Sequence, residues 1–462
     1  MDWFGRRWRV LVLLAGLTGD RAWAQRSELM PVAPMPEATA AARWVAQETP
    51  PPGFLVHEKP DAGVTADGSP PMTLAELEAI ALERNPTLQQ AAMQVEAFRG
   101  EYLQAGLHPN PVIGYQAEEI GDQGTAGQQG GFVEQEIVTA GKLGLRRRVA
   151  GHAVAEAQSL LAAQRQRVLN DVRSGYYDVL AAQRVVEVSE EIVRIQEKGA
   201  ETTRQLLEAK EVSRVDLLQA NVEAESARLK RSTARNRLEA AWRRLTAVLG
   251  APGMPMPRLD AVRESDMAQL EWQESFDRLL SSSPELAAAK ARVDRARCEV
   301  ARQCADRVPN VGVLGAVRYD NAEQQTLASV QVGMPLPVFN RNQGNIYRAQ
   351  SELVAAQAEV DRLELQLYNR LAEAFERYRN SQTQITRYTS EILPSAQQAM
   401  ELVAQGYRQG ELSYLELLTS QRTFADVNLD YLESLQQFWT STVAIEGMLL
   451  TGGLQTTLGS AN

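Results

Sequence analysis

The chain contains one pattern twice, separated by a nearly constant offset. Residues Lys210–Leu218, KEVSRVDLL, return 200 positions later as Gly410–Leu418, GELSYLELL. Several turn residues keep the same or nearly the same spacing: Pro109-Asn110 and Pro309-Asn310, Gly144 and Gly344, Asn85-Pro86 and Ser283-Pro284. Turns and helical runs would have to coincide independently for such an offset to arise by chance. The fold therefore reduces to one unit of roughly 180 residues, present twice.

The first residues have the pattern of an export signal. Arg6, Arg7 and Arg9 precede an apolar run at 10–16, and Ala22-Trp23-Ala24 supplies the small residues of a cleavage site. The run is too short for a signal anchor, which needs about 18 to 20 apolar residues. Residues 25–71 then hold nine of the 20 prolines, which is typical of an extended arm.

The duplication predicts two fused half-units in place of the roughly three domains that this length would suggest. We expect a signal peptide at 1–24, a proline-rich arm at 25–71, a first repeat at 72–250, a linker at 251–272, a second repeat at 273–452 and a C-terminal tail at 453–462.

Long helices dominate each expected repeat. Residues 142–250 contain no proline and are rich in alanine, leucine, glutamine, glutamate and arginine, a composition that favours helix. A helix over 143–207 would measure roughly 100 Å. We expect a reversal at 209–213 and a return helix at 214–249. The second half should repeat this with a helix at 344–393, a continuation after Pro394, a reversal at 410–413 and a helix to 450.

A β-hairpin is expected before each long helix, at about 111–139 and 310–339. The segments VIGYQAEEIG and FVEQEIV flank a stretch rich in glycine and glutamine, and VGVLGAVRYD is followed by a polar turn and TLASVQVG. Neither face of the strand beginning at Val311 is strongly polar. A two-stranded hairpin is only marginally stable on its own, and four strands are too few to close a barrel, which needs about eight or more. The hairpins are therefore explained if several chains contribute strands to one closed barrel wall.

Composition and motifs argue against several classes of function. The formal net charge of −10 and the lack of a basic stripe argue against a nucleic-acid partner. The sequence has no complete phosphate loop, no G-x-S-x-G elbow and no HExxH motif, so we expect no enzyme, no cofactor and no metal site. Cys298 and Cys304 lie six apart on an expected helix, about 9 Å along its axis and on diverging faces, so we expect free thiols.

The duplication, the two reversals and the segments QEIVTAGKLG and PLPVFNRNQG together resemble the TolC-like outer membrane efflux proteins, over about 72–452. The resemblance implies a mainly α fold with a membrane β-barrel: a homotrimer with a twelve-stranded barrel in outer membrane lipid and a periplasmic α-helical coiled-coil tunnel. It also implies passive conduction, with a periplasmic adaptor and an inner-membrane pump as partners. The alternative from another class is a periplasmic coiled-coil adaptor or scaffold without a barrel, which would not explain the paired hairpins.

The resemblance assigns a candidate periplasmic gate to the reversals. In this family acidic residues just after the second reversal ring the closed tip, and Glu416 takes the first of those places while Thr419 stands where some relatives have a second acid. Asp216 is the equivalent acid of the first copy. The turns themselves contain Glu211, Ser213, Gly410 and Ser413. The alternative is that Asp216 and Glu416 only stabilise the first turns of their helices, where the helix macrodipole favours a carboxylate and Ser213 and Ser413 serve as N-caps.

The segment PLPVFNRNQG also resembles the branch of the family that is paired with heavy-metal exporters. That branch implies a pump of the resistance-nodulation-division type and metal ions as the cargo. The alternative reading of the same residues is structural, because Pro335 and Pro337 would end a strand and 340–344 would turn the chain into the next helix.

Overall fold

The structure, a computed structural model, describes residues 72–257, 259 and 269–454. The expected signal peptide and proline-rich arm, most of the expected linker and the end of the expected tail lie outside these residues.

The two halves have the same order of elements, as the duplication predicts. The first half contains α2 (Leu74–Arg84), α3 (Pro86–Ala105), β1 (Val112–Glu118), a short 3₁₀ turn η1 (Asp122–Gly124), β2 (Gln128–Ile137), α4 (Lys142–Glu208) and α5 (Arg214–Val248). The second half contains α6 (Trp272–Ser282), α7 (Pro284–Ala305), β3 (Val311–Asp320), β4 (Gln325–Gly333), α8 (Gln343–Arg387), a π-helical turn η3 (Tyr388–Ile392), α9 (Leu393–Arg408) and α10 (Tyr414–Glu446).

The start of the first half is built from two local caps. Thr73 caps α2 through a capping box with Glu76, so two free N–H groups of the first turn are satisfied. Asn85 caps α3 through Thr87 N, and its side-chain amide donates to the carbonyl of Val248 at 2.7 Å. One asparagine thereby joins the beginning of the repeat to its end.

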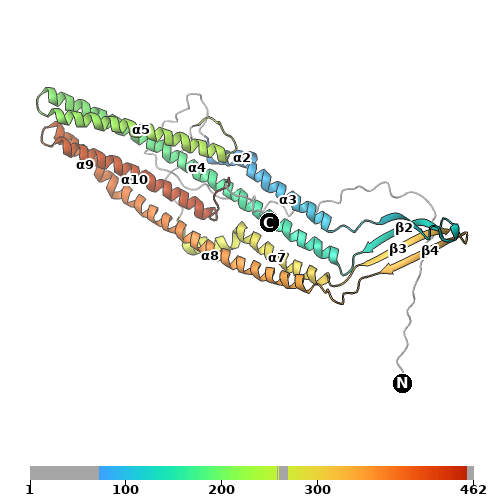
Figure 1. The fold of residues 1–462 in the computed structure, drawn as a ribbon. Helices are drawn as coiled ribbons and strands as arrows, with labels where there is room; N and C mark the ends of the chain where they lie inside the picture. The colour runs from blue at the N-terminus through green and yellow to red at the C-terminus, as the bar shows by residue number, and fades with distance from the viewer. Residues whose placement is uncertain (1–71, 258, 260–268, 455–462) are drawn as a thin grey trace, which may run out of the picture. The chain divides into compact units, whose positions relative to one another are not determined.

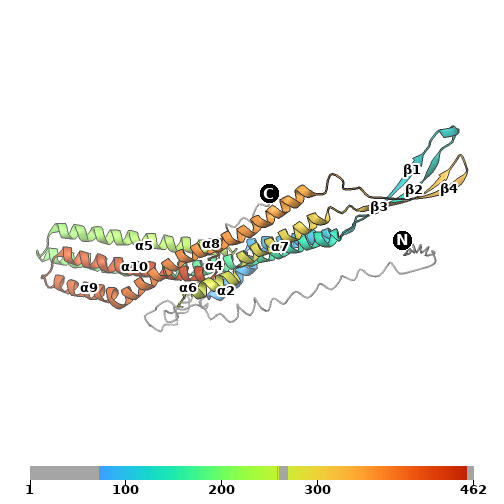
Figure 2. The same ribbon diagram turned by 90° about the horizontal axis from the view of Figure 1, so that it is seen from below.

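The second half accommodates Pro394 by a change in helical pitch that the sequence did not predict. We expected one helix over 344–393, but α8 ends at Arg387 and the π-helical turn η3 follows. Pro394 then lies in the first turn of α9, the part of a helix that best tolerates a residue without an N–H. The helical path therefore continues past the proline, as Figure 2 shows for α8 and α9.

The two hairpins form one antiparallel sheet in the order β1-β2-β3-β4, in which β2 pairs with β3 along its whole length. Gly130 makes this pairing possible, because a Cβ there would lie 2.0 Å from the carbonyl oxygen of Val317. The ring of Phe132 lies over Gly114 on the neighbouring strand. The stretch rich in glycine and glutamine thus contributes its last four residues to β2.

The helices lie beside one another on either side of α4. Next to the sheet, α3 packs on α4, α4 on α7, and α7 on α8; farther from the sheet, α4 packs against α5 and α10. The core at the junction is aromatic, with Tyr177 stacked on Trp439 at 4.9 Å and Tyr378 against Phe438 at 5.3 Å. Such ring pairs stabilise a fold by about 0.5 to 1.5 kcal/mol beyond their burial. The sheet and the two reversals lie at opposite ends of these helices (Figure 1).

Candidate functional site

The pairing of the four strands separates charged from uncharged side chains. Directly paired residues point to the same face of a sheet, and residues along a strand alternate. All charged side chains of β1 to β4 fall on one face: Glu118, Glu134, Glu136, Arg318 and Asp320. Within these four strands the opposite face has none, and its apolar members include Ile113, Tyr115, Val133, Val317, Tyr319, Val330 and Val332. The sheet is therefore amphipathic.

The uncharged face is open to the surroundings. Ile113 and Val330 are each 77% exposed, and Tyr115, Val317 and Val332 are also exposed. A contiguous apolar surface of this kind marks contact with lipid or with another protein. The residue pattern of β3 taken alone predicts this face only weakly, because it has apolar residues on both sides.

The charged face is held by contacts across the strands. Arg318 on β3 contacts the carboxylate of Glu118 on β1, and the Gln128 side chain donates to Asp320 at 3.3 Å. At the helix end, Asn310 donates to Glu136 at 2.7 Å and accepts from the buried Lys142 ammonium at 2.6 Å. With four carboxylates and one guanidinium, this face is acidic.

Among the residues that the structure describes, both outer strands of the sheet keep a free edge, since β1 pairs only with β2 and β4 only with β3. The helices that continue these strands also have exposed apolar residues. On α3 these are Met93 and Leu103, and on α8 they are Tyr347, Val354, Leu365 and Tyr368. The two sides of the repeat thus each combine an unpaired strand with an apolar helix surface.

The two reversals close with the same backbone hydrogen bonds. In the first, Lys210 N donates to Leu207 O and Glu211 N to Leu206 O; in the second, Gly410 N donates to Tyr407 O and Glu411 N to Gly406 O. This is the pattern of a Schellman motif, which needs a left-handed residue after the helix. Gly410 has φ +75°, and Lys210 adopts φ +62° without a glycine's freedom. The first copy therefore has lysine where the second has glycine, and the two turns have the same backbone conformation.

The tip acids form capping boxes in both copies. The Asp216 carboxylate accepts from Ser213 N at 2.9 Å and from Ser213 Oγ at 2.8 Å. The Glu416 carboxylate accepts from Ser413 N at 2.7 Å and from Ser413 Oγ at 2.9 Å. Hydrogen bonds from the Ser413 backbone and then its hydroxyl hold the pKa of the exposed Glu416 below its ordinary value.

Thr419 behaves differently from the two acids. Its hydroxyl donates to the carbonyl of Leu415 at 2.8 Å, within its own helix. The N-cap geometry expected from the sequence is present at both reversals, where Asp216 and Glu416 complete the capping boxes.

The structure adds contacts between the reversals that sequence reasoning missed. Tyr407 and Tyr414 pack edge to face at 6.1 Å, and the Tyr407 hydroxyl lies 3.1 Å from Thr203 Oγ1 on α4. Burial, followed by the charge of Glu223, raises the pKa of Tyr414 to about 12. Arg422 on α10 contacts Glu223 on α5. The sequence feature that could have revealed these contacts is the presence of a tyrosine on each side of the Gly410 turn.

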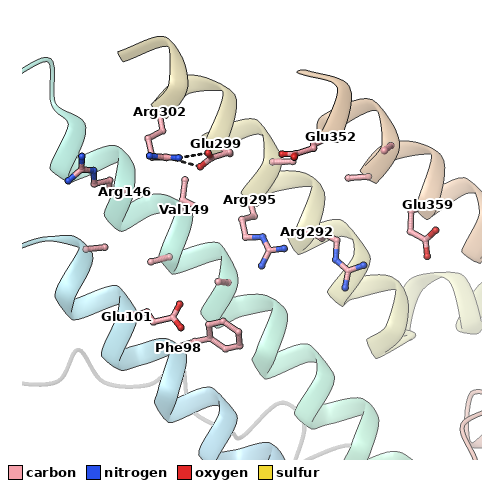
Figure 3. A pocket seen from close by; sticks show the side chains of 16 residues that line it. Phe98, Glu101, Arg146, Val149, Arg292, Arg295, Glu299, Arg302, Glu352 and Glu359 are labelled. Atoms are coloured by element: carbon pink, nitrogen blue, oxygen red, sulfur yellow. Dashed lines mark hydrogen bonds and ion pairs between the residues drawn. The ribbon is translucent and has the colours of Figure 1, made fainter. Parts of the chain in front are cut away.

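A groove of about 990 Å³ lies among α3, α4, α7 and α8. Figure 3 shows Glu299 and Arg302 joined on its α7 wall. Arg292 and Arg295 pair with the buried Glu156 at 2.8 and 3.1 Å. These pairings account for the three α7 arginines that line the groove.

None of the helices in 72–257 and 269–454 is long and apolar enough to cross a bilayer. The same residues contain no group of three or more His, Cys, Asp or Glu side chains that could hold a metal ion. Cys298 and Cys304 are free thiols.

Comparison with known families decides what kind of protein this is. The family model described as outer membrane efflux protein matches residues 78–251 and again residues 276–449. The chain belongs to the outer membrane efflux protein family. The two matches also follow the two copies of the repeat, and the family match decides against the alternative of a periplasmic adaptor or scaffold.

Relatives and solved structures agree with this assignment. The cobalt-zinc-cadmium resistance protein CzcC of Cupriavidus metallidurans is 28% identical over 82% of this chain and 90% of its own length. The nickel-cobalt-cadmium resistance protein NccC of Alcaligenes xylosoxydans is 23% identical over 66% of this chain and 69% of its own. The structure of CusC, described as forming a transmembrane channel, aligns with a TM-score of 0.72 at 18% identity, covering 87% and 97% of the two chains.

Family membership confirms the fold class and function expected from the sequence. The chain is an outer membrane exit duct of an efflux system, with a large periplasmic helical part. Such ducts work with a periplasmic adaptor and an inner-membrane pump, and the family is one of efflux channels rather than enzymes.

Proposed function

We propose that three copies of this outer membrane efflux protein close one wall, with the uncharged face of the sheet against lipid and the acidic face around the channel. Three times four strands give twelve, within the range of outer membrane barrels, which have about 8 to 26 strands. The amphipathic four-stranded sheet with two free edges is the observation that carries the proposal.

The free edges are the reason that one copy is insufficient. Unpaired N–H and C=O groups in lipid each cost several kcal/mol, and β1 and β4 both leave such groups unmatched. Pairing β4 of one copy with β1 of the next satisfies both edges and brings the apolar surfaces of α8 and α3 together. Because this contact is head-to-tail, it must close into a ring or continue as a filament.

Intermolecular crosslinking tests the arrangement. Cysteines placed on β1 and β4, in a chain carrying Cys298→Ser and Cys304→Ser, are expected to form trimers on oxidation in isolated outer membranes. Cysteines on β2 and β3, which are already paired within one chain, serve as the control and should yield no intermolecular product. If the β1 and β4 cysteines also remain monomeric at every register tried, the proposed wall is wrong.

We infer that the cargo of this duct is a divalent metal cation and that the partner pump is of the resistance-nodulation-division type. The names of CzcC and NccC assign them to resistance against cobalt, cadmium, zinc and nickel. The acidic face of the sheet suits cation passage, because clefts of one sign concentrate counter-ions. Deleting the gene should raise the sensitivity of the cells to cobalt, zinc and cadmium, and unchanged sensitivity to all three would count against metal cargo.

The tip acids belong to the same proposal. Around a three-fold axis, Asp216 and Glu416 would present six carboxylates near the periplasmic entrance and focus negative potential there. We further propose the repeat boundaries 72–250 and 273–452, with the linker 251–272 between them; the family matches at 78–251 and 276–449 support these divisions.

A further inference from the structure

The connections that lead from the sheet into the two long helices differ between the halves. Four residues separate the end of β2 at Ile137 from the start of α4 at Lys142, whereas nine separate Gly333 at the end of β4 from Gln343 at the start of α8. The longer connection contains large apolar side chains that are all exposed: Met334, Leu336, Val338 and Phe339. Phe339 is 91% exposed, more than any other large apolar residue described.

The first apolar side chains of this connection continue the uncharged face of the sheet. On β4 that face is formed by Val330 and Val332, and the same alternation gives Met334 and Leu336 beyond the strand, before the chain turns where Val338 N donates to the Leu336 carbonyl at 2.8 Å. Pro335 and Pro337 lie on either side of Leu336. Because proline has no N–H to donate to a ladder, this stretch presents apolar side chains without extending the free edge that pairs with another copy.

The position of the connection relative to a bilayer follows from strand length. A strand of ten residues such as β3, tilted by about 45°, rises roughly 24 Å, close to the apolar band of about 25 Å on outer membrane barrels. Residues after β4 at the helix end therefore lie at the rim of the band, where lipid headgroups begin.

Aromatic side chains point to the same location. Outer membrane barrels have aromatic girdles at both interfaces. On the uncharged face, Tyr115 and Tyr319 lie toward the turn end of the hairpins, while the described residues of that face at the helix end include no aromatic side chain: Gln135, Ile137, Val311, Val313 and Val332. Phe339 supplies an aromatic ring at the helix end, and the exposed Arg341 follows it.

We propose that Met334–Phe339, together with Arg341, is a lipid anchor at the periplasmic rim of the membrane-embedded sheet. The apolar side chains enter the interfacial layer, and the guanidinium of Arg341 meets lipid phosphates, as basic residues at membrane interfaces do. A second copy of the chain fits this surface less well, because Met334 and Leu336 continue the face of the sheet and the prolines beside them cannot extend the ladder at its edge. The inference rests on the proposed function, in which this face meets lipid.

Spin-label accessibility distinguishes lipid, water and protein surroundings. Single cysteines replace Phe339, Val330 and Thr386 in the full-length chain carrying Cys298→Ser and Cys304→Ser, and each variant is labelled with a nitroxide and reconstituted in vesicles of phosphatidylethanolamine and phosphatidylglycerol. Thr386 is exposed on α8, roughly 65 Å along the helix from its start, and provides the aqueous reference.

We expect the label at 339 to collide readily with oxygen and poorly with a water-soluble nickel chelate, like the label at 330 and unlike that at 386. A label at 339 that collides readily with the nickel chelate, or with neither reagent because a second copy covers it, would overturn the anchor while a lipid-exposed 330 leaves the proposed function intact. A water-exposed label at 330 would overturn both.

Discussion

Thr203 and Tyr407 lie in different halves of the chain, yet their hydroxyl groups meet at 3.1 Å. Thr203 also donates to the carbonyl of Gly199 at 2.9 Å, so the Tyr407 hydroxyl is the donor in the contact between α4 and α9. This bond, with the Arg422–Glu223 contact, ties the first reversal of the chain to the second.

Removing the Tyr407 hydroxyl should loosen the tip. A net hydrogen bond contributes about 1 kcal/mol, so Tyr407→Phe is expected to speed local opening of the first reversal roughly fivefold. Hydrogen exchange of the amides at 204–216 measures this. Tyr388→Phe, in the π-helical turn away from the reversals, is the matched control and should leave these amides unchanged. Equal exchange in wild type and Tyr407→Phe would show that the bond does not hold the reversals together.

The charge and the capping role of Glu416 are separable. Glu416→Gln removes the charge, whereas Ser413→Ala removes the serine's side-chain contact and keeps the carboxylate. If the tip acids focus cations, Glu416→Gln should reduce the cation-to-anion permeability ratio roughly twofold in planar bilayers, and Ser413→Ala should retain it. A reduction with Ser413→Ala alone, or with neither variant, would leave Glu416 only a capping role.

Acid should weaken the same cap. The folded pKa of Glu416 is lowered by hydrogen bonds from Ser413, so its contribution is fully present above the unfolded value of about 4.3 and is lost as the pH falls through the folded pKa. Protection factors of the amides at 417–420, corrected for intrinsic exchange, should fall between pH 6 and pH 3.5 in wild type. Glu416→Gln should start lower and change less; parallel curves for the two proteins would contradict this account.

Two adjacent residues of β4 test the faces of the sheet. Val330 lies on the uncharged face and Gln331 on the charged face, and both are exposed. A lysine on the lipid face of a barrel costs about 2 to 4 kcal/mol near the bilayer midplane. Val330→Lys should therefore reduce the amount of trimer in outer membranes, measured as the gel band that dissociates to monomer when the sample is heated. Gln331→Lys should assemble normally. If both variants assemble equally, the uncharged face does not meet lipid.

Features that depend on local chemistry were predictable from the sequence. The capping boxes at Ser213 and Ser413 and the long helix α4 follow from residue types and spacing over a few turns. The amphipathic sheet was not predictable in the same way, because β3 alone has apolar side chains on both faces. Only the register between β2 and β3 places the carboxylates Glu134 and Glu136 on the same face as Arg318. Contacts across the repeats, such as Thr203 with Tyr407, have no local signature for the same reason.

The number of chains in the assembled particle tests the central claim most directly. Each copy has an uncharged, exposed sheet face and two unpaired edge strands, and we hold that identical copies supply the missing partners. Native mass spectrometry of protein extracted from outer membranes in mild detergent should give three times the mass of the mature chain. A particle of one chain that remains folded and stays in solution after the detergent is removed would contradict it.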